Sequence, residues 1–431
     1  MKNVLMLTKY FYPFNCMATQ RTAKLAKYLP EYGWNPIIVC PKWTAKNCIH
    51  FDPQMVDELK KYNVVKFVTF KGASWSTPMK KLVSIISIIA TPKIFVTKAI
   101  SKIAPTLSAR KYPVEFYYES IPFLRTFLRS NKIDCVWATY PPPVTHTIAD
   151  WINKTFGIPW IGDFRDIPDQ KHKYGQSDRL REYRIKVEPV TLASSSAIVT
   201  VSEGLKEVLQ KRHKVPVYVI PNGFDPSDYT DGQPQKQEVF SIVYTGSVTF
   251  PIRNPIPLFE ALETLISDRR IKPEEISVSF YGTPPELIKR LLQNFKNLYN
   301  VVQLFPLVPF TKSIAIQKQA CILLHLAHIG ERGILTGKLF EYFGARRPIL
   351  CIPGDNDCVD ALLEQTKAGV VCRNAAETAA QLLRWYKEWK QTGTVSYYGR
   401  EEEIMKYSRK EQARDLAKLL DQISIKSCQI T

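Results

Sequence analysis

The residues best suited to chemistry lie in a glycine-rich loop and the amphipathic helix that should follow it, at 330–350. Thr336 and Gly337 are candidate N-cap residues, and the free amides at such a helix start attract phosphate. Arg332 and Lys338 add two positive charges, and Glu341 shares a helix face with Lys338 because it lies three residues further on. The pattern predicts a phosphate at Lys338 with an adjoining ribose near Glu341. The alternative is an ordinary capped helix with a surface Lys338–Glu341 pair.

A second group of charged residues follows an apolar run that should be a strand ending at Gly162. Asp163, Arg165 and Asp166 come directly after it. A carboxylate at the edge of a cleft can orient an acceptor hydroxyl or stabilise developing positive charge. The alternative is an ion pair of Arg165 with Asp163 or Asp166 that only fixes a turn.

Two further loops carry candidate residues. The loop at 8–20 leads into a helix that begins near Arg21, which could meet an anionic acceptor or form a salt bridge. In the segment 244–247, Gly246 would let the backbone approach a ligand closely, and Arg253 follows downstream.

Signals for a metal site are weak in this sequence. The Asp355-Asn356-Asp357 run has the spacing of a cation site, but this composition after a strand is more typical of a turn. His325 and His328 lie three apart without a nearby Cys or acidic partner, which favours a structural role. Nine cysteines without a Cys-x-x-C spacing argue against zinc and iron–sulfur sites. We expect no metal and no cofactor.

The elements that must position these residues alternate short apolar runs with longer amphipathic ones. This alternation predicts an α/β fold with parallel sheets covered by helices. In such sheets ligands bind beyond the carboxyl ends of the strands. The expected strands are 4–7, 37–40, 64–70, 134–139, 158–162, 197–201 and 217–220, then 240–245, 276–281, 301–305, 321–326, 348–352 and 369–372.

The chain of 431 residues is long enough for two domains. A stretch rich in Pro, Asn, Gly and Asp at 221–234 reads as the linker. We expect two Rossmann-like domains, 1–232 and 233–400, that face each other across a cleft. Residues 401–431 should form a C-terminal helix that crosses back to the first domain.

A basic stretch at 60–114 contains eleven Lys or Arg residues and no Asp or Glu. The apolar segment within it, at 82–96, is interrupted by Pro92 and Lys93 and is too short to span a bilayer. Basic flanks around a short apolar segment are typical of a helix in the interface of an anionic membrane. The alternative is a core helix with a solvated lysine face. Nucleic acid is not an expected partner, because aromatic interleaving and known motifs are missing.

Four segments together resemble the retaining, nucleotide-sugar-dependent glycosyltransferases of family 4, which have the GT-B fold. They are 10–13 with 20–21; 201–205 before 219–225; 244–246; and 336–342 leading to 347–349. The sequence departs from the family in the first loop, where many members carry a Gly-Gly pair. It also has Gly333 at the position of the first of two glutamates that stand eight apart.

The resemblance implies a nucleotide-sugar donor bound mainly by the second domain. Glu341 would hold the ribose, and Arg332 or Arg253, Lys338 and the amides around Thr336 and Gly337 would hold the diphosphate without a metal. The first domain would bind the acceptor. Asp166 would take the catalytic, acceptor-facing role there, with Arg165 and Arg21 on the acceptor side.

The expected activity is sugar transfer with retention to a lipid-linked saccharide in bacterial surface polysaccharide biosynthesis, such as capsule or O-antigen. The short apolar run before Thr8 does not fit a signal peptide, so we expect a cytoplasmic protein at the inner face of the plasma membrane. Two alternatives remain open, a nucleotide-sugar epimerase on the same fold and a non-catalytic scaffold protein.

Overall fold

The structure is a computed structural model that describes residues 1–431 except 49, 69–106, 169–177, 230–235, 331 and 429–431. Contacts divide the chain into two compact units. Unit 1 comprises Met1–Val201, Leu205–Ile220 and Ala413–Thr431, and unit 2 comprises Ser202–Gly204 and Pro221–Gln412. The domain boundaries expected from the sequence stay predictions.

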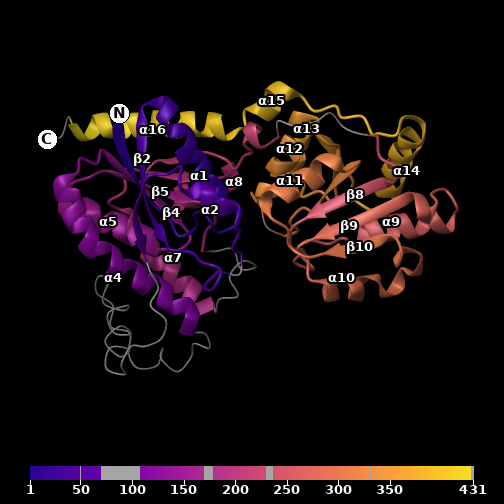
Figure 1. The fold of residues 1–431 in the computed structure, drawn as a ribbon, viewed down its shortest axis with the longest axis horizontal. Helices are drawn as coiled ribbons and strands as arrows, with labels where there is room; N and C mark the ends of the chain where they lie inside the picture. The colour runs from indigo at the N-terminus through magenta and orange to yellow at the C-terminus, as the bar shows by residue number, and fades with distance from the viewer. Residues whose placement is uncertain (49, 69–106, 169–177, 230–235, 331, 429–431) are drawn as a thin grey trace. The chain divides into compact units, whose positions relative to one another are not determined.

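Unit 1 contains a parallel sheet of seven strands in the order β3-β2-β1-β4-β5-β6-β7 (Figure 1). The chain builds outward from β1 in one direction and then from β4 in the other, so the carboxyl ends of β1 and β4 mark the topological switch point. The strands are β1 Lys2–Leu7, β2 Trp34–Pro41, β3 Val64–Val68, β4 Cys135–Tyr140, β5 Trp160–Phe164, β6 Ala197–Thr200 and β7 Val217–Val219.

Unit 2 contains a second parallel sheet, with six strands in the order β10-β9-β8-β11-β12-β13. Its switch point lies at the carboxyl ends of β8 and β11. The strands are β8 Phe240–Thr245, β9 Ile276–Tyr281, β10 Val302–Phe305, β11 Ile322–His325, β12 Ile349–Cys351 and β13 Gly369–Val371.

Helices connect the parallel strands in both units, as this strand order requires. The α-helices that follow strands of unit 1 are α1 Met17–Tyr28, α2 Met55–Leu59, α4 Leu107–Ser130, α5 Val144–Phe156, α7 Asp178–Leu192 and α8 Glu203–Arg212. Those of unit 2 are α9 Ile256–Ser267, α10 Pro285–Leu291, α11 Phe310–Gln319, α12 Gly337–Ala345, α13 Cys358–Thr366, α14 Ala375–Thr392 and α15 Glu401–Met405, and the chain ends with α16 Arg409–Cys428.

The predicted α/β class with two parallel sheets is confirmed, and each predicted strand overlaps an observed one. The prediction worked because strands covered on both faces are almost continuously apolar. Strand β8 shows this arrangement. Phe240, Ile242 and Tyr244 lie in one core cluster, which includes Leu258 of α9, and Val243 lies in another.

Several strand ends differ from the prediction by one to three residues, and the end of β5 bears on the candidate site. Strand β5 continues to Phe164 instead of ending at Gly162, so Asp163 lies inside the sheet. Its carboxylate can be buried there because Arg21 pairs with it, and that partner lies far away in the sequence.

The second half of α16 packs in unit 1. Asp421 accepts hydrogen bonds from Lys2 Nζ at 2.9 Å and from Trp34 Nε1 at 3.2 Å. These contacts join the last helix to β1 and β2 and agree with the predicted return of the C-terminal helix to the first domain.

The basic stretch falls largely outside the described residues, and so does the apolar segment at its centre. Three of its lysines lie near carboxylates: Lys60 pairs with Asp57 and Lys61 with Glu58, while Lys66 lies 3.9 Å from a carboxylate of α4. Among the described helices, none has the length and apolar character needed to cross a membrane.

Candidate functional site

The switch point of unit 2 brings together two segments that the sequence singled out separately. Gly246 follows β8 with φ of 121°, and a Cβ atom there would lie 3.0 Å from both Cε and Nζ of Lys338. The Lys338 ammonium lies 3.4 Å from the centre of the Tyr244 ring. A cation over an aromatic face at this distance is favourable. The positive φ is the reason that glycine is favoured at 246, and the end of the Lys338 side chain occupies the space beside it.

Helix α12 begins beside this contact. Thr336 is its N-cap residue, with an extended backbone conformation, but its side chain makes no capping hydrogen bond. The Oγ1 atom of Thr336 is buried and has no hydrogen-bond partner among the described residues. An α-helix leaves its first amides without intrahelical partners. The start of α12 therefore offers hydrogen-bond donors and a positive dipole end to an anion.

Arg253 is fixed next to the same edge of the sheet. Its Nε donates to His328 Nε2 at 3.1 Å, and its Nη1 donates to the Ser247 carbonyl at 3.0 Å. Within the described parts of the chain, neither Arg253 nor Lys338 forms an ion pair with a carboxylate. Burial lowers the pKa of Lys338, the positive charge of Arg253 lowers it further, and Glu341 acts in the opposite direction. Such a group gains most from an anionic ligand.

Glu341 lies one turn further along α12 and contacts a polar cluster. Its Oε2 accepts a hydrogen bond from Gln317 Nε2 at 3.2 Å, and the same nitrogen donates to Thr245 Oγ1 at 3.0 Å. The alternative of a surface Lys338–Glu341 pair is wrong, because the structure shows no ion pair between them and Glu341 bonds to Gln317. Burial raises the pKa of Glu341 to about 7, while Gln317 and Lys338 oppose the rise.

This pKa predicts a pH-dependent stability. The folded-state pKa of about 7 lies above the ordinary value of 4.5, so the folded protein holds an extra proton between these values. Stability should fall as the pH rises through this window, by up to about 3 kcal/mol at 1.36 kcal/mol for each pKa unit. Urea denaturation at pH 5 and pH 8 should show this fall in the wild type, and Glu341→Gln should remove it. Equal pH slopes in the two proteins would show that Glu341 is ionised throughout.

For two of the predicted donor-binding residues, Arg332 and Gly337, the structure gives only the position and the burial. Arg332 is exposed, and Gly337 is the first residue of α12 and is buried. The structure thus brings Gly246, Arg253, Thr336, Gly337 and Lys338 to one edge of one sheet. Their role in binding a donor stays a prediction.

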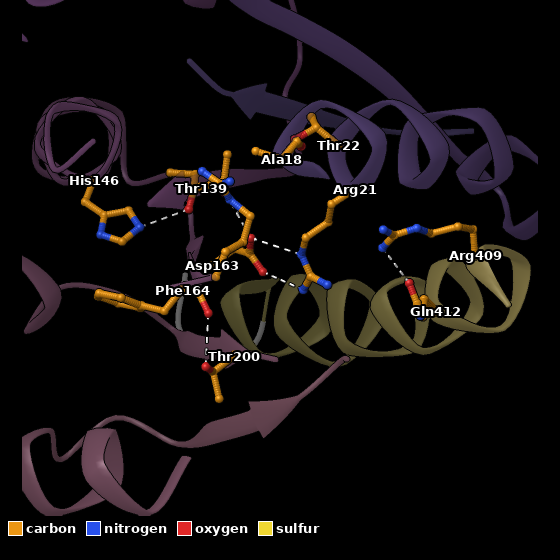
Figure 2. Close-up of polar contacts among 12 residues, drawn as sticks. Ala18, Arg21, Thr22, Thr139, His146, Asp163, Phe164, Thr200, Arg409 and Gln412 are labelled. Atoms are coloured by element: carbon orange, nitrogen blue, oxygen red, sulfur yellow. Dashed lines mark hydrogen bonds and ion pairs between the residues drawn. The ribbon is translucent and has the colours of Figure 1, made fainter. Parts of the chain in front are cut away.

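In unit 1, Arg21 and Asp163 form a buried ion pair (Figure 2). Arg21 Nη2 and Nε donate to the Asp163 carboxylate at 2.7 and 3.3 Å, and both side chains are almost fully buried. Thr139 Oγ1 donates to the same carboxylate at 3.0 Å. The pairing of Asp163 with Arg165 that the sequence left open is therefore wrong. The salt-bridge interpretation of Arg21 agrees with these contacts, and a role of Arg21 on the acceptor side stays a prediction.

Arg165 and Asp166 follow β5 at the carboxyl edge of the unit 1 sheet and are half-buried. Arg165 Nε donates to Thr139 Oγ1 at 3.0 Å, and its guanidinium carbon lies 5.3 Å from the centre of the Tyr10 ring. Burial raises the pKa of Tyr10, which Arg165 opposes and Asp166 supports. The loops after β1 and β5 therefore meet at the switch point of this sheet, which is where an acceptor-binding site was expected.

The Asp355–Asp357 segment is the one group with metal-ligand geometry among the described residues, together with Cys358. Its carboxylates are used by the backbone. Asp355 accepts hydrogen bonds from the amides of Asp357 and Val359, and Asp357 accepts one from the amide of Gly333. These contacts fit the turn that the sequence favoured.

Comparisons with known proteins show what family and what fold this chain resembles. Residues 90–228 match the family model described as Glycosyltransferase Family 4. No curated protein matches the sequence. The chain thus resembles the family 4 glycosyltransferases, as its motifs predicted.

Solved structures show the same fold over nearly the whole chain. HepE from Anabaena, in a structure with UDP-glucose, has a TM-score of 0.63 at 11% identity, with 98% of this chain and 100% of that chain covered. A glycosyltransferase from Rickettsia africae has a TM-score of 0.57 at 16% identity, with 98% of each chain covered. Sucrose-phosphate synthase from Thermosynechococcus elongatus has a TM-score of 0.57 at 12% identity, with 100% of this chain and 98% of that chain covered. The protein has the GT-B fold.

Sequence reasoning missed several residues of the unit 2 edge. Gln317 of α11 donates to Thr245 Oγ1 and to Glu341 Oε2, and the Tyr342 hydroxyl of α12 accepts a hydrogen bond from the Thr245 amide at 3.2 Å. No pattern in the sequence marks Gln317. His325 and His328 were noticed but interpreted as structural. His325 ends the central strand β11 and His328 lies in the loop after it, and this position was the signal that could have placed them with Arg253 and Lys338.

Proposed function

We propose that the protein is a nucleotide-sugar-dependent glycosyltransferase whose donor binds at the carboxyl edge of the unit 2 sheet. The observation that carries this proposal is the pair of cations, Arg253 and Lys338, which lack carboxylate partners among the described residues and lie close to the start of α12. A diphosphate supplies the negative charge that this arrangement stabilises. The resemblance to family 4 and the UDP-glucose bound by HepE support the same ligand class.

Within this site each residue has a proposed role. Lys338, Arg253 and the exposed Arg332 neutralise the diphosphate, and the amides at Thr336 and Gly337 donate to its oxygens. Gly246 allows the loop after β8 to approach these groups. Glu341, which Gln317 holds in place, accepts hydrogen bonds from the ribose hydroxyls. We propose that no metal is needed, because these groups together offset the charge of the leaving diphosphate.

The proposed reaction retains the configuration at the sugar. The bond between the anomeric carbon and the diphosphate oxygen breaks, and the acceptor oxygen forms a bond to that carbon on the same face. The proton of the acceptor hydroxyl passes to the leaving diphosphate oxygen, so no protein nucleophile is required. We assign Asp166 to the orientation of the acceptor hydroxyl, with Arg165 beside it at the edge of the unit 1 sheet.

The proposed acceptor is a lipid-linked saccharide of bacterial surface polysaccharide assembly. The basic stretch at 60–114 supports this proposal, because eleven basic residues without an acidic one would be attracted to an anionic membrane surface. Removing residues 80–102 should then release the protein from vesicles that contain phosphatidylglycerol, as measured by co-sedimentation. Unchanged binding to these vesicles would contradict the membrane assignment.

The donor proposal is tested by thermal denaturation with UDP, GDP, CMP and ADP, followed by an assay of sugar release. A ligand that binds the folded state alone raises the melting temperature. We expect one nucleoside diphosphate to do so and its sugar conjugate to be consumed when acceptor is present. Consumption without any acceptor would indicate an epimerase instead. The lack of any stabilisation would favour a non-catalytic scaffold protein.

A further inference from the structure

His325 is a buried histidine whose ring makes no hydrogen bond. It is the last residue of β11 and is 1% exposed. Neither Nδ1 nor Nε2 has a hydrogen-bond partner among the described residues. Its backbone is satisfied by a regular contact, since the Ile352 amide donates to the His325 carbonyl at 2.9 Å. Buried polar atoms without partners are rare in native proteins because they lose their hydration without replacement.

The titratable groups whose charge acts on this ring are all basic. They are Lys338 of α12, Arg253 of the segment after β8, and His328 of the loop after β11. Burial lowers the pKa of His325 strongly, and the charges of these neighbours lower it further. The ring is therefore neutral and offers one N–H donor and one acceptor nitrogen.

A core role does not explain these features. A buried histidine with a structural role bonds to a neighbour, as His146 of unit 1 does with the Ala138 carbonyl at 3.0 Å. A metal-binding role lacks ligands, since no Cys, Asp or Glu joins His325 in a metal-ligand group among the described residues. The cationic surroundings instead favour an anionic partner.

We propose that His325 is a further binding residue of the donor site, which donates a hydrogen bond from its neutral ring to a phosphate oxygen of the nucleoside diphosphate. This inference rests on the function proposed above. Thr336 supports it, because its Oγ1 is another buried polar atom without a partner among the described residues and lies at the start of α12, one turn before the proposed ribose-binding Glu341. A neutral imidazole ring supplies an N–H that donates a hydrogen bond. It adds no positive charge to a site that already contains Arg253 and Lys338.

The proposal predicts opposite effects on stability and on binding. His325→Leu replaces a ring with two unsatisfied atoms by an apolar side chain, so the protein without ligand should melt at the same or a higher temperature. Binding of the nucleoside diphosphate should weaken by about tenfold or more, the factor expected for one lost hydrogen bond to a charged group. His325→Gln keeps an N–H donor and should bind within about threefold of the wild type.

His146→Leu is the matched control. This buried histidine has a hydrogen-bond partner and lies in unit 1, so its replacement should lower the melting temperature and leave nucleotide affinity unchanged.

The experiment is titration calorimetry with the nucleoside diphosphate that stabilises the wild type most, with its nucleoside, and with inorganic pyrophosphate as a probe without a base. We expect His325→Leu to lose affinity for the diphosphate and for pyrophosphate while its affinity for the nucleoside stays unchanged. A lower melting temperature together with unchanged diphosphate affinity would identify His325 as a structural residue and overturn the inference, with the donor site intact. Failure of the wild type to bind any of these probes would overturn the proposed function and this inference together.

Discussion

Lys338→Met should weaken nucleoside diphosphate binding by about ten- to 150-fold and reduce sugar transfer at least as much. A hydrogen bond to a charged group contributes about 1.5–3 kcal/mol, and each 1.4 kcal/mol is a factor of ten. Methionine keeps an unbranched apolar side chain at this position but removes the ammonium that lies over the Tyr244 ring and next to Gly246. Because burial and Arg253 already disfavour the charged amine, the variant should be as stable as the wild type. Calorimetry and initial-rate measurements check the two effects.

A control variant distinguishes the loss of Lys338 from the loss of any one positive charge on unit 2. Lys312 of α11 is exposed and belongs to the same unit, so Lys312→Met removes the same charge far from the start of α12 in the sequence. We expect this variant to bind and transfer like the wild type. Near-normal turnover of Lys338→Met would mean that the donor site has been assigned to the wrong residues.

The strands were predictable from the sequence because their environment is simple. A strand covered by helices on both faces needs apolar side chains in both directions, and β4 and β8 show this as nearly unbroken apolar runs. Strand β5 was placed less accurately because its end depends on a charge. Asp163 continues the strand only because Arg21, which is 142 residues away, neutralises it. Pattern analysis does not detect such a partner.

The candidate donor site was predictable in its local parts. Lys338 and Glu341 share a helix whose start and apolar face can be read from the sequence, and Gly246 follows a clear strand. The contacts between these parts were not predictable, since they depend on the strand order. Strands β8 and β11 are neighbours in the sheet, which places Gly246 beside Lys338 and His325 beside both Lys338 and Arg253. The sequence order separates these residues by up to 92 positions.

The largest loss of stability is expected from breaking the Arg21–Asp163 pair. Arg21→Met should destabilise the protein by about 3–5 kcal/mol, because it leaves a carboxylate inside the unit 1 sheet with Thr139 as its remaining donor among those described. Urea denaturation measures this loss. Lys154→Met, which breaks an exposed pair with Asp150 on α5, should change stability by less than about 0.5 kcal/mol.

A double variant distinguishes the pair from simple packing. Arg21→Met leaves the Asp163 carboxylate without its cationic partner, and Asp163→Leu removes that carboxylate. The double variant should therefore lose less free energy of unfolding than the sum of the two single losses. A double loss equal to that sum would show that the two side chains contribute independently. Because Arg165 bonds to the same Thr139 hydroxyl that contacts Asp163, Arg21→Met should also disturb the acceptor-side edge. Nucleotide binding by unit 2 should persist in this variant under conditions where it stays folded. This result would show that the Arg21–Asp163 pair supports the acceptor side and that the donor site does not depend on it.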